Sequence, residues 1–168
     1  MKIGIIGVGN VGVSIAYTMF FKKGITEIRL NDINKDKALG EAEDLRQAAG
    51  IMRSSIIINA VRKKYLIHCD YIFICCGKAR QSSSEEMNGL YKDNARLLKK
   101  VIKDLPRDKI YIITNPVERL AKLFKVKYLG KILDETRYLM KAKDGGWIVD
   151  KKGNTRWGVA MEAWRVVK

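Results

Sequence analysis

Three closely spaced glycines near the start of the chain have the spacing of a phosphate-binding turn. Gly7, Gly9 and Gly12 follow an apolar run rich in Ile, and a helical pattern begins at Asn10. In the G-x-G-x-x-G spacing the first glycine permits a tight turn, the second lets the backbone approach a pyrophosphate, and the third lets the helix pack closely on the strand. The free N–H groups at the start of the helix then attract phosphate oxygens. A purely structural glycine turn has the same spacing, so the pattern alone does not decide.

A carboxylate, Asp32, stands where a dinucleotide site needs one. It ends the second apolar run, twenty residues after Gly12. At that place a carboxylate accepts hydrogen bonds from the hydroxyls of an adenosine ribose. Strand, glycines, helix, second strand and acid therefore follow one another in the required order. We predict that this part of the chain binds a dinucleotide.

Apolar strands alternate with amphipathic helices along the first 130 residues, and these elements must position the site. We expect strands over 2–8, 25–30, 54–60, 69–76 and 109–114, and helices over 10–22, 36–48, about 86–104 and from 115 onward. Apart from Asp70, the run at 69–76 is apolar, as in a strand buried on both faces of a parallel sheet. The alternation predicts an α/β fold, a doubly wound parallel sheet of the Rossmann type, in a domain over residues 1–130.

After residue 130 the pattern changes. We expect residues 131–168 to form a small helical remnant of a second domain, with helices over 133–141 and 155–168 and a short strand over 147–149. The last helix carries an apolar stripe that suits either the core or a subunit interface. The stripe consists of Trp157, Ala160, Met161 and Trp164.

The charge of the chain is strongly positive. Its 33 Lys and Arg against 18 Asp and Glu give a formal net charge of +15. Such a charge attracts polyanions such as nucleic acid, but it also suits a soluble Lys-rich surface. No aromatic residues alternate with the basic ones, and no nucleic-acid-binding motif accompanies them, so we do not expect nucleic acid as a partner.

The cysteines and the apolar runs favour a soluble protein of the cytoplasm. Cys69, Cys75 and Cys76 lie in or beside one apolar strand, without metal-ligand spacing or a disulfide framework. We expect them to be buried, inert thiols. No apolar run reaches the length of a membrane span, and the first one lacks a small-residue cleavage site.

Six short segments follow one another in an order that points to a family. They are G-V-G-N-V-G at 7–12 with Asp32, G-E-A-E-D-L at 40–45, G-K-A-R at 77–80, T-N-P-V at 114–117, L-D-E-T-R at 133–137 and K-G-N-T-R-W at 152–157. In these segments the chain resembles the lactate and malate dehydrogenases over nearly all of its length. The resemblance implies NAD as the cofactor and a small 2-hydroxy or 2-oxo acid as the substrate.

The resemblance also implies a role for individual residues. Asp32 would select NAD over NADP, since a 2′-phosphate would meet its negative charge. Asn115 would hydrogen-bond the substrate oxygen beside the nicotinamide, and Arg137 would bind the substrate carboxylate as a planar fork. Asp134 would orient a catalytic histidine, and Arg80 stands where an Arg favours malate and oxaloacetate.

These implied roles define two sets of site residues, with Thr155 lining the substrate pocket beside them. The catalytic set consists of Arg80, Asn115, Asp134 and Arg137. The cofactor set consists of Gly7, Gly9, Asn10, Val11, Gly12, Asp32, Gly77, Asn94 and Asn115.

Two catalytic parts of the family pattern are missing from the chain. The G-E-H-G segment that carries the family's catalytic histidine is absent, and the single histidine is His68. His68 precedes an apolar strand, whereas ligands of such sheets bind where strands end. The family's loop arginine falls on Glu86 when counted from Gly77 and on Met87 when counted from Asn94. Losing both groups should lower the rate by orders of magnitude.

We therefore predict an NAD(H)-binding protein that is an oxidoreductase on a 2-hydroxy acid if it is active. The alternative is a noncatalytic NAD-binding sensor or scaffold subunit. We expect a homo-oligomer, because the apolar stripe of the last helix offers a surface for a second copy.

Overall fold

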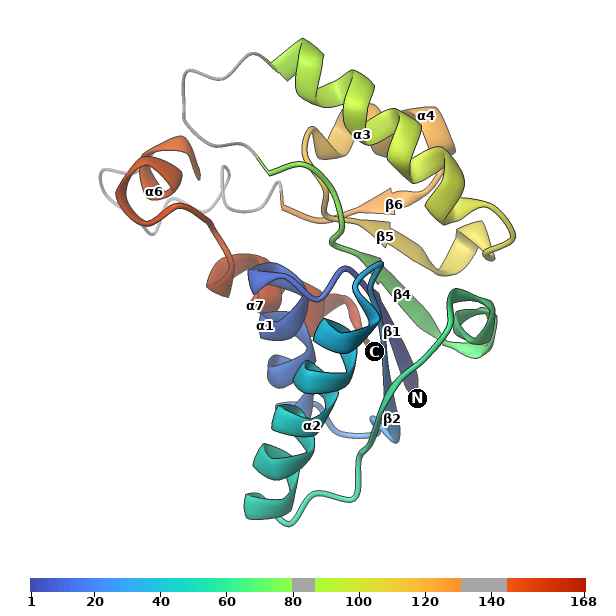
Figure 1. Cartoon of the computed structure of the whole chain (residues 1–168), viewed down its shortest axis with the longest axis vertical. Helices are drawn as coiled ribbons and strands as arrows, with labels where there is room; N and C mark the ends of the chain where they lie inside the picture. The colour runs from blue at the N-terminus through green and yellow to red at the C-terminus, as the bar shows by residue number, and fades with distance from the viewer. Residues whose placement is uncertain (80–86, 131–144) are drawn as a thin grey trace.

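A six-stranded parallel sheet forms the centre of the molecule, in the order β3-β2-β1-β4-β5-β6 (Figure 1). The computed structural model describes residues 1–79, 87–130 and 145–168. The strands are β1 (Lys2–Ile6), β2 (Glu27–Asn31), β3 (Ile57–Ala60), β4 (Tyr71–Ile74), β5 (Ile110–Ile112) and β6 (Lys127–Tyr128). The chain moves outward from β1 to β3, then returns to pair β4 with the other edge of β1. The strand order therefore reverses between β1 and β4, which is the switch point where ligands bind such sheets.

The inner strands are apolar on both faces because helices cover both sides of the sheet. In β1 the side chains of Ile3 and Ile5 enter one core and Ile6 enters the other. In β4 the side chain of Phe73 joins the first core and Ile72 the second. This alternation confirms burial on both faces for β4, which is shorter than the predicted strand over 69–76, and Asp70 just before it is exposed.

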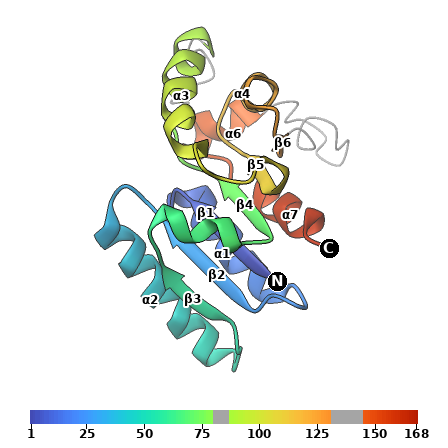
Figure 2. The same ribbon diagram turned by 90° about the vertical axis from the view of Figure 1, so that its right-hand side faces the viewer.

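Each face of the sheet has its own helices. Helices α1 (Asn10–Thr18), α2 (Lys35–Ile51) and α7 (Trp157–Val166) supply side chains to the first core, and α3 (Met87–Ile102) and α4 (Val117–Phe124) to the second. In a second view, α2 runs beside β3 (Figure 2). Short 3₁₀ turns connect the elements at η1 (Met19–Phe21), η2 (Lys63–His68) and η3 (Arg107–Lys109). The predicted doubly wound α/β sheet is confirmed.

Helix α7 belongs to the core of the sheet domain. Its small residues Ala160 and Ala163 are buried and let it approach α1 closely. Of the predicted apolar stripe, Ala160 packs in this core, whereas Trp157 and Met161 are 56% and 54% exposed. Trp164 is half-buried against the same core, so the stripe is divided between the core and the solvent. A boundary between domains at residue 130 stays a prediction.

A buried acid ties α7 to the end of the sheet. Glu162 is 8% exposed, and its Oε2 accepts a hydrogen bond from the Gly130 backbone N–H at 2.7 Å. At the other end of α7, the Lys168 N–H donates to the Tyr71 hydroxyl at 3.2 Å. The late helix is thus anchored on both the loop after β6 and the start of β4.

One predicted strand is wrong, and one strand was not predicted. Residues 147–149 lie in helix α6 (Gly145–Lys152) instead of a strand. Three apolar residues in a row cannot distinguish a strand from a helix turn, and the β-branched Ile148 and Val149 misled the assignment. The two-residue strand β6 lacked any apolar pattern, since Lys127 and Tyr128 are both exposed. The helix predicted over 133–141 lies outside the described residues.

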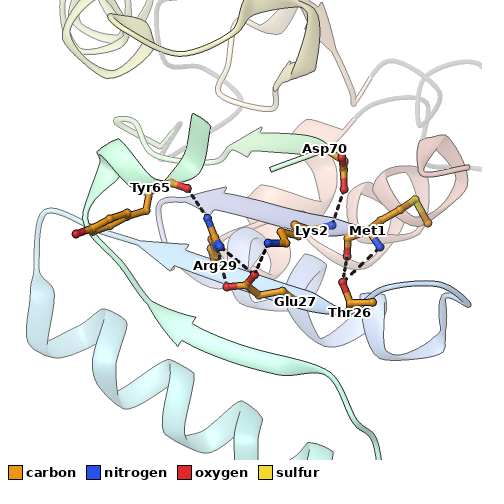
Figure 3. A network of polar contacts seen from close by, with 7 residues as sticks. All are labelled: Met1, Lys2, Thr26, Glu27, Arg29, Tyr65 and Asp70. Atoms are coloured by element: carbon orange, nitrogen blue, oxygen red, sulfur yellow. Dashed lines mark hydrogen bonds and ion pairs between the residues drawn. The ribbon is translucent and has the colours of Figure 1, made fainter. Parts of the chain in front are cut away.

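Ion pairs and hydrogen bonds link β1, β2 and η2 near the amino ends of β1 and β2 (Figure 3). Arg29 donates from Nε and Nη2 to the two carboxylate oxygens of Glu27, at 2.7 and 3.0 Å, and from Nη1 to the Tyr65 carbonyl. Lys2 Nζ lies 3.5 Å from the same carboxylate. The hydrogen bonds from Arg29 hold the pKa of Glu27 below its ordinary value.

Within the described part of the chain, no helix is both long and apolar enough to cross a bilayer.

Candidate functional site

Two positions at the turn after β1, Gly7 and Gly12, accept only glycine. Gly7 has a φ of +94°, and a Cβ there would lie 2.4 Å from the backbone nitrogen of Cys76. A Cβ on Gly12 would lie 2.0 Å from the carbonyl oxygen of Gly7. These two glycines therefore let β1, α1 and the end of β4 approach one another at the switch point.

Packing within the chain does not explain the glycine at position 9. Nothing lies within 4 Å of a Cβ built on it, and its φ of −78° suits any residue. The folded chain itself therefore does not need a glycine at this position. A ligand that approaches the backbone closely does need one, which matches the role that the sequence assigned to Gly9.

The start of α1 is an uncapped helix N-terminus. Gly9 is its N-cap, no side chain accepts from its first N–H groups, and its first turn contains no acid. Helix geometry leaves the N–H groups of Asn10, Val11 and Gly12 without carbonyl acceptors inside the helix. Partial positive charge therefore gathers at the open side of the Gly9 turn. Gly9 and Asn10 are exposed there, so an anion can reach these donors.

Asp32 follows the end of β2 and faces the same turn. Its Oδ2 accepts from the Val8 N–H at 2.8 Å and its Oδ1 from the Asn34 N–H at 2.9 Å. These two bonds fix the half-buried carboxylate beside the glycine turn, and each oxygen keeps acceptor capacity for a ligand hydroxyl. The carboxylate is thus held beside the glycine turn and the start of α1. The sequence did not anticipate the contact between Val8 and Asp32.

A buried amide joins the two loops that follow β4 and β5. Asn94 on α3 is 1% exposed. Its Oδ1 accepts from the Lys78 N–H at 2.8 Å, and its Nδ2 donates to the carbonyls of Lys78 and Asn115 at 3.1 and 2.7 Å. With both polar atoms bonded to backbone, Asn94 is a positioning residue for these loops. The sequence reasoning had placed it only in the cofactor set.

Gly77 packs closely against Thr114 and Asn94 in the same region. A Cβ on Gly77 would lie 2.3 Å from Cγ2 of Thr114 and 3.0 Å from Oδ1 of Asn94. The Thr114 hydroxyl in turn donates to the Cys76 carbonyl at 2.6 Å. The sequence reasoning missed this role of Thr114, although its place beside the apolar run of β5 was a signal. Asn115 follows directly and is exposed, with its side chain free to meet a ligand.

The thiols near the site are not nucleophiles. Cys75 and Cys76 point to opposite cores, and both are half-buried and unpaired in disulfides. Burial raises the pKa of Cys76 to about 11 and that of Cys75 further, so both stay protonated at neutral pH. Cys69 lies two residues before β4, at the opposite end of the strand from the site. It is fully buried, and burial raises its pKa to about 11 as well.

The structure thus brings all nine residues of the predicted cofactor set to one edge of the sheet. Gly7, Gly9, Asn10, Val11, Gly12 and Asp32 surround the turn after β1, and Gly77, Asn94 and Asn115 gather at the ends of β4 and β5. Of the predicted catalytic residues, Arg80, Asp134 and Arg137 lie outside the described residues, as does Glu86.

The single histidine is remote from this edge. His68 is exposed at the end of η2, directly before β4, and therefore lies at the opposite end of that strand from Gly77. Thr155 is half-buried, two residues before α7. Among the described residues, no group of three His, Cys, Asp or Glu side chains is placed to hold a metal ion.

The chain is similar to one family throughout this region. Residues 1–132 match the model of the lactate/malate dehydrogenase NAD-binding domain. A malate dehydrogenase of Archaeoglobus fulgidus is 29% identical over 178 residues, which covers 92% of this chain and 60% of the relative. An L-lactate dehydrogenase of Fervidobacterium nodosum is 35% identical over 125 residues, which covers 72% of this chain and 40% of the relative. The chain spans about half of the length of the curated relatives that it matches.

Solved structures show the same fold. The malate dehydrogenase of Archaeoglobus fulgidus, solved in complex with NADH, has a TM-score of 0.79 at 23% identity and covers 100% of this chain and 76% of its own. The minor L-lactate dehydrogenase of Enterococcus mundtii has a TM-score of 0.72 at 19% identity, over 99% of this chain and 76% of its own.

Proposed function

The chain belongs to the lactate/malate dehydrogenase family through its NAD-binding domain, and we propose that it binds NAD(H) without itself supplying the acid for hydride transfer. One observation carries the proposal for binding. The glycine turn leaves open space at Gly9 in front of an uncapped helix, and Asp32 is fixed beside it. Together these features fit a pyrophosphate and an adjacent ribose.

Particular atoms would hold the cofactor. The N–H groups of Asn10 and Val11 would donate to pyrophosphate oxygens, and the absent Cβ of Gly9 would let the pyrophosphate approach. The free lone pairs of Asp32 would accept from the ribose hydroxyls. A 2′-phosphate would meet the negative charge of that carboxylate, which favours NAD over NADP. When bound, the nicotinamide ring supplies hydride chemistry at the ends of β4 and β5.

The lack of a suitably placed histidine argues against turnover by this chain alone. Reduction of a 2-oxo acid requires a proton donor within hydrogen-bond reach of the carbonyl oxygen. The single histidine of the chain, His68, is exposed at the opposite end of β4 from the site. A positioned acid contributes about 10²–10⁴-fold to such a rate. We therefore favour a noncatalytic NAD(H)-binding sensor or scaffold subunit.

A second candidate function is an oxidoreductase that acts on a 2-hydroxy acid. Asn115 favours it, because this exposed amide stands at the end of β5 with its backbone held by Asn94. In this function Asn115 would bind the substrate oxygen, Arg137 the carboxylate and Arg80 a second carboxylate as in malate, with Asp134 beside them. A homo-oligomer and a cytoplasmic location belong to the same proposal.

Two measurements separate these functions. Calorimetric titration of the full chain with NADH should give saturable binding, and NADPH should bind at least about tenfold more weakly. A steady-state assay with NADH and either oxaloacetate or pyruvate should give no turnover above the solvent background. No NADH binding at millimolar cofactor would refute the binding proposal, and turnover proportional to enzyme would establish the oxidoreductase instead.

A further inference from the structure

The solvent side of α3 carries a row of cations. The opposite side of this helix is buried and includes Leu90, Leu98 and Ile102. The exposed cations recur every three or four residues, so at 3.6 residues per turn they share one face of the helix and its last turn. We call this row the basic face; it consists of Lys92, Arg96, Lys99, Lys100 and Lys103.

The charges of the basic face repel one another. Arg96 has like-charged neighbours three or four positions away on both sides, at Lys92, Lys99 and Lys100. Like charges at these spacings destabilise a helix. None of the five forms an ion pair with another described residue, and Asp93 on the same helix pairs with Lys78 at 3.7 Å instead. Among the described residues, the five cations of this face therefore have no ion-pair partner, and the nearby acids Asp93 and Asp104 are fewer than the cations.

The helix dipole accounts for only part of the row. Cations in the last turn stabilise the negative end of a helix, which explains Lys99, Lys100 and Lys103. Lys92 and Arg96 lie more than one turn from that end, where the dipole gives them no benefit. The dipole therefore does not account for these two cations.

The preceding 3₁₀ turn extends the basic face. Lys63 on η2 donates from Nζ to the carbonyls of Lys100 and Lys103, both at 3.0 Å. This contact neutralises the negative end of α3 and holds η2 beside it. The exposed neighbours Arg62 and Lys64 are thereby brought next to the basic face. Asp104 and Asp108 follow in the next turn, so the cations remain in excess.

From this arrangement we propose that the basic face, extended by Arg62 and Lys64, binds the phosphate backbone of a nucleic-acid duplex without reading its sequence. Lys92 and Lys103 are about 16 Å apart along the helix axis, at 1.5 Å per residue. A duplex presents one charge per about 1.7 Å, or about ten over that length, so its charge complements the whole row.

A duplex fits better than a single strand. Single-strand binding uses exposed aromatic rings on which bases stack. No aromatic ring lies between the cations of the basic face, and the nearby Tyr65, although 47% exposed, has Lys64 Nζ lying 5.0 Å from the centre of its ring. The +15 net charge alone did not favour nucleic acid as a partner. The clustering of five cations on one helix face, without ion pairs to other described residues, does favour it.

The test compares two triple variants of the full chain with a labelled duplex of about 20 base pairs, by fluorescence anisotropy over a salt series. The first variant is Arg96→Gln, Lys100→Gln and Lys103→Gln. The matched control removes the same charge from exposed positions elsewhere, with Lys23→Gln, Lys35→Gln and Lys37→Gln. Both variants are first checked for an unchanged circular dichroism spectrum and for NADH binding like that of the unsubstituted chain, since none of these residues lies in the proposed cofactor site.

We expect the first variant to weaken duplex binding about 100-fold at about 0.1 M salt and to lower the slope of log K against log salt by about 3, because each lost phosphate contact lowers it by about 0.9. The control should change affinity less than about threefold.

Equal losses in both variants would overturn the proposal, since binding would then follow net charge alone. No duplex binding by the unsubstituted chain at about 0.1 M salt would also overturn it. A third contrary result is retention on phosphatidylserine vesicles that only the first variant loses, with no duplex binding, since it would assign the face to membranes.

Discussion

Replacing Gly9 with alanine should abolish most cofactor affinity without unfolding the chain. The new methyl group meets nothing within 4 Å, and the local φ of −78° suits alanine. A weaker N-cap costs about 0.5–1 kcal/mol, and the stiffer unfolded chain returns about 0.4–1 kcal/mol. We therefore expect the free energy of unfolding to change by less than about 0.5 kcal/mol.

The effect on binding should be much larger. A methyl group at Gly9 would stand between the backbone and the pyrophosphate, so that at least one hydrogen bond from the start of α1 to a phosphate oxygen is lost. A hydrogen bond to a charged group contributes about 1.5–3 kcal/mol. This corresponds to a loss of about 10- to 100-fold in NADH affinity. Calorimetric titration measures the affinity, and urea unfolding measures the stability.

Two other glycines serve as controls. Gly12→Ala would place its Cβ 2.0 Å from the Gly7 carbonyl oxygen, and it should cost about 1–3 kcal/mol of stability. Gly40→Ala on exposed α2 meets nothing and should stabilise the chain by about 0.5–1 kcal/mol, with unchanged affinity. If the NADH affinity of Gly9→Ala lies within twofold of that of the unsubstituted chain, the pyrophosphate does not approach the backbone at Gly9.

Three further substitutions test the site and the sheet. Asp32→Asn should weaken NADH binding about tenfold and narrow the preference for NADH over NADPH, measured by parallel titrations; an unchanged ratio would exclude Asp32 as the ribose ligand. Asn94→Leu should lower the free energy of unfolding by about 1–3 kcal/mol or more, because buried backbone groups lose their partner; thermal unfolding at the wild-type midpoint would contradict this. Glu27→Gln should destabilise the chain near neutral pH and progressively less as the pH falls below 4.5, since the depressed pKa of Glu27 gives stability above its unfolded value that is lost as the pH falls through the folded value; a destabilisation independent of pH would show that the charge of Glu27 contributes nothing through its pair with Arg29.

The sequence was most informative where local chemistry and fold coincide. Glycines with a steric requirement, such as Gly7 and Gly12, and long apolar strands such as β4 leave few alternatives, so the order of elements and the cofactor edge followed from them. Asp32 could be placed for the same reason, because it ends a strand adjacent to the glycine turn.

Contacts between segments far apart in the chain could not be predicted from the sequence. Nothing local shows that Asn94 will join the loops after β4 and β5, or that Glu162 will reach Gly130. The orientation of α7 was equally hidden, because Ala160 and Ala163 decide which face approaches α1, and the larger Trp157 is left exposed. Small residues set the closest approach of helices, whereas pattern reasoning weighs large apolar ones.

The most direct test of cofactor binding is a ¹⁵N NMR titration of the full chain with NADH, which reports each backbone N–H separately. The largest shifts should occur at the N–H groups of Asn10, Val11 and Gly12, with a second group of shifts at Val8 and in the loop that contains Asp32. Shifts that spare the start of α1, or that gather on η2 and the far end of α3, would contradict this prediction.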